Sequence, residues 1–167
     1  MNFRFWSIVV VLITFSSFTN ADTEYRLEVN EILEQVNDLR SEGCYCGRKY
    51  MPPVHPVRWD NTLYRSALAH AKDMSVNEYF SHHSQEGEDI GMRLDKYGYA
   101  WQVAGENLGE GQRSFKEVLN DWKDSKSHCR MLMNPKVEDM AVARYGKYWV
   151  QHFGKKIRIS REKKSRQ

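Results

Sequence analysis

The feature that most constrains the fold is a change in hydrophobic periodicity along the chain. Over much of the chain, apolar residues recur at the three- and four-residue spacing of amphipathic helices. Near the end the period becomes two: over 140–145, Met140, Val142 and Arg144 alternate with Ala141, Ala143 and Tyr145. Residues 148–153 are rich in strand formers. We expect a hairpin turning at Tyr145-Gly146-Lys147 and a third strand at 100–104. Helices followed by a small sheet predict an α+β fold. The segments expected to be helical are 24–41, 61–79, 89–97 and 115–125.

The length and composition are those of one globular domain, which we place at residues 22–154. The chain has 167 residues, of which 41% are hydrophobic. Residues 1–21 contain one arginine, an apolar run from Phe5 to Phe15 and small residues before a cleavage site, which predicts a secretory signal peptide. The run is shorter than the roughly 20 residues of a membrane span, although an uncleaved anchor is the alternative. We expect a secreted or periplasmic protein.

Positive charge is concentrated in residues 155–167. This segment holds seven basic residues and one acidic residue, whereas residues 22–154 hold 17 basic and 21 acidic residues. A short basic tail is typical of either a disordered, solvated end or a contact with an anionic cell envelope. Export argues against a nucleic-acid partner, and we expect a monomer.

Three cysteines in an exported chain favour one disulfide. Cys44 and Cys46 are too close in sequence to bridge each other comfortably. A bond from either one to Cys129 would close a long loop and stabilise the fold by about 4–5 kcal/mol in the chain-entropy estimate. One thiol is then left free.

Six histidines include three at the ends of expected elements, where side chains can project into a shared cleft. These are His82, His83 and His128. His70 lies on the apolar face of helix 61–79 with Asp73 one turn away, which favours a buried histidine satisfied by hydrogen bonds. The remaining two are less informative: His152 alternates within a strand and could line a groove, and His55 lies between prolines. Local motifs of metalloproteases and zinc knuckles are absent, but two imidazoles and a carboxylate at loop positions permit a metal site.

Several blocks occur in the order and spacing of a known family. They are "MPPVHPVRW", "HAKDM", "YFSHHSQEG", "GYAWQVAGENLGEG", "WKDSKSHCRMLMNP" and "YWVQHFG". From Val29 to Gly154 the chain resembles a bacterial member of the CAP superfamily, which comprises cysteine-rich secretory proteins, antigen 5 and pathogenesis-related 1 proteins and is also called the SCP domain. The resemblance implies an α-β-α sandwich, in which a small, largely antiparallel sheet lies between helical layers and a cleft opens on one face.

The resemblance also selects residues for that cleft. It implies His82 from the F-S-H element, Glu106 from "GEN" and His128 from "SKSHC", with His83 at a variable position. A second glutamate is usual in the family, and Ser125 stands in its place here. Lys126 and Ser127 also depart from the usual residues of this block. We expect Ser125, His70 and Asp73 to line the cleft.

Two interpretations of the His82, Glu106 and His128 set remain open. The three residues could hold Zn²⁺ or another divalent cation, weakly because the second carboxylate is missing, or they could be a hydrogen-bonded network that braces the cleft. The three prolines and two cysteines of residues 44–59 predict an ordered, irregular connector. The resemblance further implies that Cys46 pairs with Cys129, tying this connector to the turn that carries His128, and that Cys44 is the odd thiol.

Three functions compete. The first is a secreted binding module whose cleft takes a metal and a small lipid, peptide or glycan. The second is a metal-dependent hydrolase, with Glu106, His82 and His128 as its catalytic candidates; this leaves Asp73 and Ser125 as the nearest spare groups for a base. The third is an envelope-associated structural domain. In each case we expect the same apolar core: Trp59, Leu63, Ala67, Met74, Val118, Trp122, Val142, Trp149 and Phe153.

Overall fold

The structure is a computed structural model that describes residues 20–158, with side chains described from Glu28 onward. The predicted α+β class is confirmed, although strands also lie between the helices rather than only after them. In chain order the elements are α1 Asn20–Glu42, β1 Cys44–Cys46, β2 Lys49–Met51, β3 Arg58–Trp59, α2 Asn61–Val76, α3 Ile90–Lys96, β4 Trp101–Glu110, α4 Phe115–Asp124, α5 Lys126–Leu132, β5 Asp139–Tyr145 and β6 Tyr148–Lys156.

The main sheet has the strand order β3-β5-β6-β4. Strand β6 pairs antiparallel with both β5 and β4, and only the two-residue strand β3 pairs parallel, with β5. The predicted hairpin is confirmed: Tyr145 pairs with Tyr148 around the turn at Gly146, whose φ of 59° suits a glycine. The sheet is therefore small and largely antiparallel, as predicted, and β4 is one of its edges.

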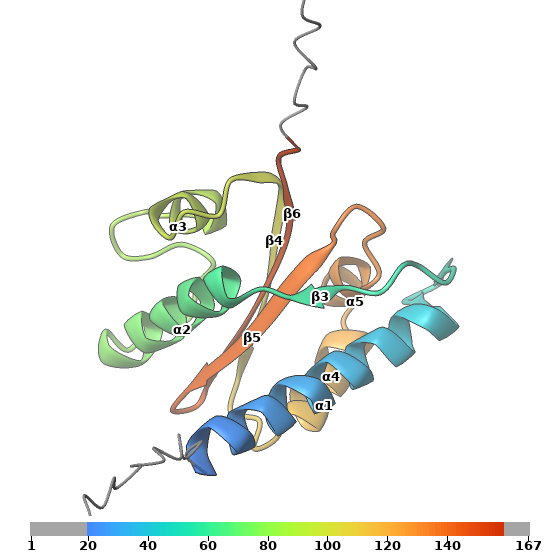
Figure 1. Ribbon diagram of the computed structural model, residues 1–167, viewed down its shortest axis with the longest axis horizontal. Helices are drawn as coiled ribbons and strands as arrows, with labels where there is room; N and C mark the ends of the chain where they lie inside the picture. Colours follow the sequence, from blue (N-terminus) through green and yellow to red (C-terminus); the bar gives the residue numbers. More distant parts are fainter. Residues whose placement is uncertain (1–19, 159–167) are drawn as a thin grey trace, which may run out of the picture.

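Helices cover both faces of this sheet, which confirms the α-β-α sandwich (Figure 1). Helices α2 and α3 lie on one face, and α1, α4 and α5 lie on the other. Alternation along β5 sorts the side chains between the faces. Met140 and Val142 pack with α1 and α4, whereas Ala141 and Ala143 pack with α2 and α3.

The predicted core is confirmed with one exception. Eight of the nine candidates are buried, with at most 4% of their surface exposed, and Trp59 is half-buried against two apolar clusters. Trp59 lies on β3 at the other edge of the sheet from β4, which explains why it is not fully enclosed.

Two helix starts follow from their capping residues. Asp60 accepts hydrogen bonds from the backbone N–H groups of Thr62 and Leu63, which begins α2, and Ser114 accepts one from Glu117, which begins α4. Helix α2 ends three residues earlier than predicted because the chain reverses after it, with Glu78 at a φ of 53°.

The structure corrects the prediction of an irregular connector. Residues 44–51 form a two-stranded hairpin, β1 and β2, rather than irregular chain. Helix α5 and strand β3 were also not predicted, and β4 extends to Glu110 rather than ending at 104. These elements are short or lack a clear period, so the amphipathic pattern could not reveal them.

Two predicted segments lie mostly outside the described residues. Of the predicted signal peptide only Asn20 and Ala21 are described, as the first residues of α1. Of the predicted tail, Lys155 and Lys156 belong to β6, so the strand runs two residues past the predicted domain boundary.

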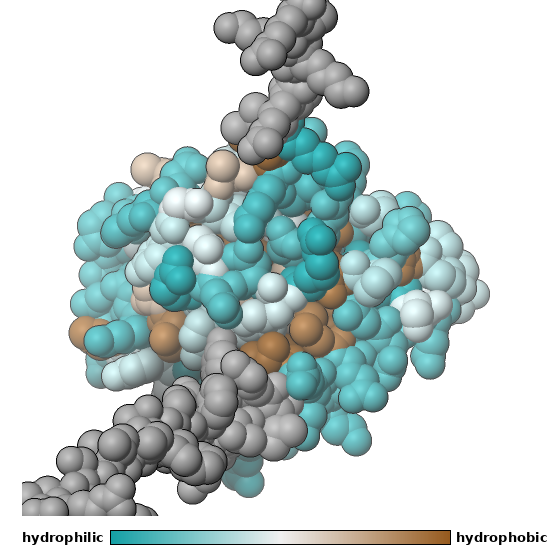
Figure 2. All heavy atoms as spheres, viewed as in Figure 1, coloured by the Kyte–Doolittle hydropathy of each residue, from teal (hydrophilic) through white to brown (hydrophobic). Residues whose placement is uncertain are grey.

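The surface in view is mostly hydrophilic, with small hydrophobic patches (Figure 2). Along the described part of the chain, no helix combines the length and the apolar character needed to span a bilayer.

Candidate functional site

The site is built around Glu106, which lies on the edge strand β4 directly opposite His152 on β6. Both side chains point to the sheet face covered by α2 and α3, the same face as Leu108 and Val150. Only 2% of the Glu106 side chain is exposed, and His152 is fully buried. A carboxylate in such a place must be compensated by donors or opposite charge.

Donors from three elements supply that compensation. Oε1 of Glu106 accepts a hydrogen bond from Nδ1 of His82 at 2.7 Å, and Oε2 accepts from His152 at 2.9 Å and from Arg93 at 2.8 Å. The ring of His70 lies 4.0 Å from the same Oε2 atom. We call Glu106, His152, Arg93, His82 and His70 the Glu106 network.

Arg93 joins the network to the loop that carries His82. From α3 its guanidinium donates to the carbonyl oxygens of Glu88 at 2.7 Å and His82 at 3.0 Å as well as to Glu106. Because Arg93 is 3% exposed, it is a buried cation held by one buried anion and two carbonyl groups. Its bond to the His82 carbonyl holds the loop in position beside the strand.

The network sets the charge of its members. Burial acts to raise the pKa of Glu106, but hydrogen bonds from His152 and His82 and the charge of Arg93 hold that pKa well below its usual range. Burial lowers the pKa of His70 to about 4 and also lowers the pKa of His152, despite its bond to Glu106. The hydrogen bond to Glu106 instead raises the pKa of His82, against a smaller opposing effect of burial.

The neighbour of Glu106 in the strand holds the second predicted histidine. Asn107 points to the opposite face, where its Nδ2 donates to the carbonyl oxygen of His128 at 3.3 Å and to Oε1 of Gln151 at 3.0 Å. Gly105 lies against Met131, so the missing Cβ lets α5 approach β4. Consecutive residues of "GEN" thus position α5, the His82 ring and the His128 backbone.

His128 itself is half-buried on α5. Burial lowers its pKa, and the nearby positive charge of His82 lowers it further. The structure thus brings His82 and Glu106 into direct contact and places His128 within electrostatic reach of His82. His83, the predicted bystander, is exposed and bonds through its backbone to Ser81.

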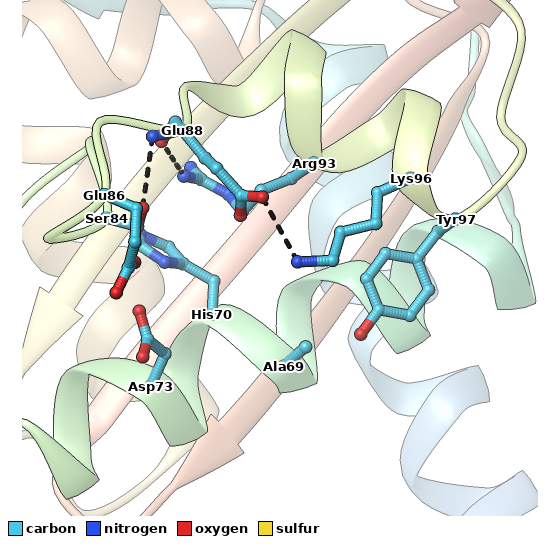
Figure 3. A pocket seen from close by; sticks show the side chains of 9 residues that line it. All are labelled: Ala69, His70, Asp73, Ser84, Glu86, Glu88, Arg93, Lys96 and Tyr97. Carbon is cyan, nitrogen blue, oxygen red and sulfur yellow. Dashed lines mark hydrogen bonds and ion pairs between the residues drawn. The ribbon is translucent and has the colours of Figure 1, made fainter.

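The predicted cleft residues divide between two places. His70 and Asp73 line a pocket of about 190 Å³ between α2, α3 and the loop joining them, together with Arg93, Glu88 and Lys96 (Figure 3). Ser125 lies instead at the junction of α4 and α5, where its hydroxyl is 3.4 Å from that of Ser127. Asp73 accepts hydrogen bonds from Asn77 and from the Tyr79 hydroxyl.

The predicted disulfide is confirmed. Cys46 on β1 is bonded to Cys129 on α5 with a Cα–Cα distance of 5.4 Å, and Cys44 is the free cysteine. Since Cys129 follows His128, the bond tethers the helix that carries this histidine to the β1–β2 hairpin.

Ligand atoms that could hold a metal gather at one other place. Among residues 28–158, one group of three or more such side chains has its ligand atoms within 4.8 Å of one another, and it is Cys44, Cys46 and Cys129. Two of these sulfurs are bonded to each other. The metal set predicted from the sequence, His82, Glu106 and His128, does not form such a group, and metal binding there stays a prediction.

Arg93 was not predicted as a site residue, and His152 was expected only to line a groove. The pattern did hold a signal for His152, which has the same strand parity as the buried residues Tyr148 and Val150 and therefore points inward rather than into a groove. Arg93 adjoins the buried Leu94 on a seven-residue helix, too short for its buried side to be defined from periodicity.

The domain is therefore a three-layer α-β-α sandwich. Its buried glutamate is hydrogen-bonded to one histidine from a loop and one from a strand. The sequence profile of the cysteine-rich secretory protein family, CAP, matches residues 33–153, and the chain belongs to this family.

Related proteins support the assignment. YkwD of Bacillus subtilis (strain 168) is 34% identical over 103 residues, which cover 60% of this chain and 40% of that protein. An extracellular protein of Bacillus anthracis that contains an SCP domain superposes with a TM-score of 0.70 at 26% identity, over 85% of this chain and 45% of that one. An outer surface protein of Borrelia burgdorferi shares the fold, with a TM-score of 0.64 at 22% identity over 83% of this chain and 97% of that one. The chain spans less than half the length of the curated relatives it matches.

Proposed function

We propose that this CAP domain is an exported, non-catalytic binding module whose cleft, at the edge of β4, presents His82 and His128 to a divalent cation and a small lipid, peptide or glycan. The observation that carries the proposal is that the hydrogen-bonding capacity of the Glu106 carboxylate is already used within the protein. Both oxygens of this carboxylate already accept hydrogen bonds, and its side chain is 2% exposed. It cannot act as a general base on a substrate without breaking the Glu106 network.

The same contacts support a particular role for Glu106 toward a metal. A histidine that binds a metal through one ring nitrogen commonly donates the other N–H to a carboxylate, which fixes the tautomer and the ring orientation. Nδ1 of His82 makes this bond to Glu106, which leaves Nε2 as its ligand atom, and 55% of the His82 side chain is exposed. His128, with its lowered pKa, supplies a neutral imidazole. Two neutral nitrogen ligands suit Zn²⁺ but hold it weakly.

Calorimetric titration with Zn²⁺ at about pH 7.5 tests this site. We expect binding by the native domain, loss of binding in His82→Ala and unchanged binding in the matched variant His83→Ala. Because its ligands must be deprotonated and the bond to Glu106 raises the pKa of His82, affinity should fall as the pH falls. Equal heats from the native domain and His82→Ala would remove the metal from the proposal.

The hydrolase remains the second candidate, because the leader pattern and the paired histidines are also consistent with an exported metalloenzyme. Such an enzyme would need a general base, and Asp73 is the spare carboxylate predicted for this role, outside the metal set. It already accepts hydrogen bonds from Asn77 and Tyr79, however. We therefore expect a peptide-library digest to show no cleavage. Cleavage that a chelator stops and His82→Ala abolishes would replace the binding module with the hydrolase.

Export and envelope contact are further parts of the proposal. The leader pattern of residues 1–21 supports export, and two structural relatives are described as an extracellular protein and an outer surface protein. Residues 155–167 carry seven basic residues and one acidic residue, which favours contact with anionic lipid or polymer. Deleting 159–167, which spares β6, should reduce low-salt binding to phosphatidylglycerol vesicles. Vesicles of phosphatidylcholine alone are the control, and an unchanged bound fraction refutes the tail contact.

A further inference from the structure

Two cysteines of strand β1, Cys44 and Cys46, lie next to the same third cysteine, Cys129 of α5. Residues two apart on a strand point to the same face, so Cys44 and Cys46 both face α5. The Sγ atom of Cys44 lies 3.4 Å from Sγ of Cys129, although Cys129 is bonded to Cys46. All three sulfur atoms lie within 4.8 Å of one another. A free thiol therefore contacts one of the two sulfurs of an existing disulfide.

The three sulfurs differ in their access to solvent. Cys46 and Cys129 are fully buried, in a cluster with Met133. Cys44 is half-buried and lines an open pocket of about 470 Å³ with Leu39, Glu42, Gly43, Tyr45, Gly47, Lys123 and Asp124. Reagents in solution therefore meet Cys44 before they meet the disulfide. Burial raises the pKa of the Cys44 thiol, and the charge of Lys123 opposes this.

We propose that β1 and α5 form an internal thiol–disulfide exchange site, in which Cys44 and Cys46 alternate as the partner of Cys129. Attack on Cys129 starts from contact, since Sγ of Cys44 already lies 3.4 Å from the sulfur to be attacked. Because all three sulfurs lie within 4.8 Å of one another, they are not yet in line, and the Cys44 side chain must turn until it faces Cys129 from the side opposite Cys46. The two positions on β1 share a face, so a small shift of the strand exchanges one pairing for the other.

The exchange is balanced and needs no oxidant. The Cys44 thiol loses its proton to water, and the thiolate attacks Sγ of Cys129. The Cys44–Cys129 bond forms as the Cys46–Cys129 bond breaks, and the bonding electron pair leaves with Cys46. The Cys46 thiolate then takes up a proton. One disulfide and one thiol are present before and after.

The exchange changes which thiol is free, and therefore whether the free thiol is accessible to solvent. With Cys46 bonded, the free thiol is Cys44 in the open pocket; with Cys44 bonded, the free thiol is the buried Cys46. In both states α5, and His128 with it, remains tethered to the hairpin. The site therefore takes low-molecular-weight thiols and disulfides as its ligand class, through the Cys44 position alone. This inference does not depend on metal binding at His82.

Removing the present partner tests whether the second pairing can form. In Cys46→Ser, air oxidation should join Cys44 to Cys129, so that a chromogenic aryl disulfide detects no free thiol in the unfolded protein. The matched variant Cys129→Ser should show two free thiols, because Cys44 and Cys46 point the same way on one strand. Two free thiols in Cys46→Ser, under conditions that oxidise the native chain, would overturn the proposal.

The native chain provides a second measurement that does not depend on the folding of a variant. The protein is incubated at about pH 8.5, near the ordinary pKa of a thiol, then acidified to stop exchange, unfolded and treated with N-ethylmaleimide. Tandem mass spectrometry must place the label, since only Tyr45 separates the two cysteines. We expect label on both Cys44 and Cys46, and none in Cys44→Ser. Label on Cys44 alone, after incubation as long as the protein stays folded, rejects the exchange.

Discussion

The two faces of the central sheet are filled in opposite ways. Toward α1, α4 and α5 the strands present large apolar side chains, which form one continuous cluster around Trp122, Met140 and Phe153. Toward α2 and α3 the same strands present a smaller apolar cluster, in which alanines pack with Leu108, Tyr148 and Val150, and beside it the Glu106 network. One face is held by packing alone over most of its area, whereas the other holds a buried ion pair that depends on every partner being present.

This contrast between the two faces explains the position of the site. Small residues on β5 and α2, including Ala143, Ala67 and Ala71, bring helix and sheet close together at one end of the polar face. At the β4 edge the space is filled by Arg93, His70 and Glu106 instead. A buried charge is expensive unless it is paired and hydrogen-bonded. The apolar face can therefore be rigid support, and the polar face can hold a histidine in one orientation.

The largest expected effect comes from the apolar face. Trp122 is 1% exposed, and its indole N–H donates to the carbonyl oxygen of Leu108 at 2.7 Å. Trp122→Ala should lower the free energy of unfolding by about 3–5 kcal/mol, measured by urea denaturation. Trp101→Ala, at a half-buried tryptophan, is the matched control and should have a clearly smaller effect. Equal losses would show that this face is not the main apolar support.

Glu106→Gln tests the polar face and should cost about 3 kcal/mol, because it leaves the buried Arg93 cation without its anion. The matched control is Glu110→Gln on the same strand, where an exposed residue pairs with Lys147. The control should change stability by less than about 1 kcal/mol. If both variants behave alike, the Glu106 network contributes no more than a surface pair and the contrast between the faces fails.

The polar face should also respond to pH. The pKa of His70 is lowered to about 4 by burial. The unfolded chain therefore binds a proton that the folded chain does not, and stability is lost as the pH falls from about 6.5 toward 4. Between pH 7 and 4.5 the loss from His70 should be about 2–3 kcal/mol. His82, whose pKa is raised, acts with the opposite sign: its contribution is present at low pH and is lost as the pH rises.

Urea denaturation across this pH range checks the assignment. His70→Gln can still donate a hydrogen bond to the Ser81 carbonyl, which His70 contacts at 3.0 Å, but it does not titrate. Its stability should fall less steeply with acid than that of the native domain, whereas His55→Gln, at an exposed histidine, should follow the native profile. Parallel profiles for His70→Gln and the native domain would assign the acid sensitivity elsewhere.

The smallest losses of stability are expected from the N-cap residues of α2 and α4. Asp60→Ala removes both N-cap bonds of α2 and an ion pair with Lys156, and should cost about 1–2 kcal/mol. Ser114→Ala removes one longer bond at the start of α4, on the apolar face, and should cost about 0.5–1 kcal/mol. The reverse order in urea denaturation would contradict the view that the polar face depends more on directed contacts.

Much of the fold could be predicted because its patterns are local. Helices near 61–76 and 115–124 follow from apolar spacing and from the caps Asp60 and Ser114. The hairpin follows from alternation around Gly146. Helix α5 could not be predicted this way, since it has seven residues and Ser125 makes no side-chain capping bond. The strand β3 has two residues and exists only because β5 pairs with it.

The site shows the same division. The resemblance selected His82 over His83 and Cys46 over Cys44, and the structure places His82 against Glu106 and bonds Cys46 to Cys129. Neither periodicity nor the family blocks selected Arg93, whose partner Glu106 lies 13 residues away on another element. The proximity of Cys44 to Cys129 was equally out of reach, because 85 residues separate them.

The class of fold, the sorting of apolar side chains and the residue types available to the cleft follow from local sequence patterns, because each depends on spacing within one element. Which charges are buried together, and which sulfurs touch, depends on how distant elements pack. Those relations arise where β4, α3 and α5 meet from distant parts of the chain, and burial there changes both the pKa of a side chain and the energy of leaving it unpaired.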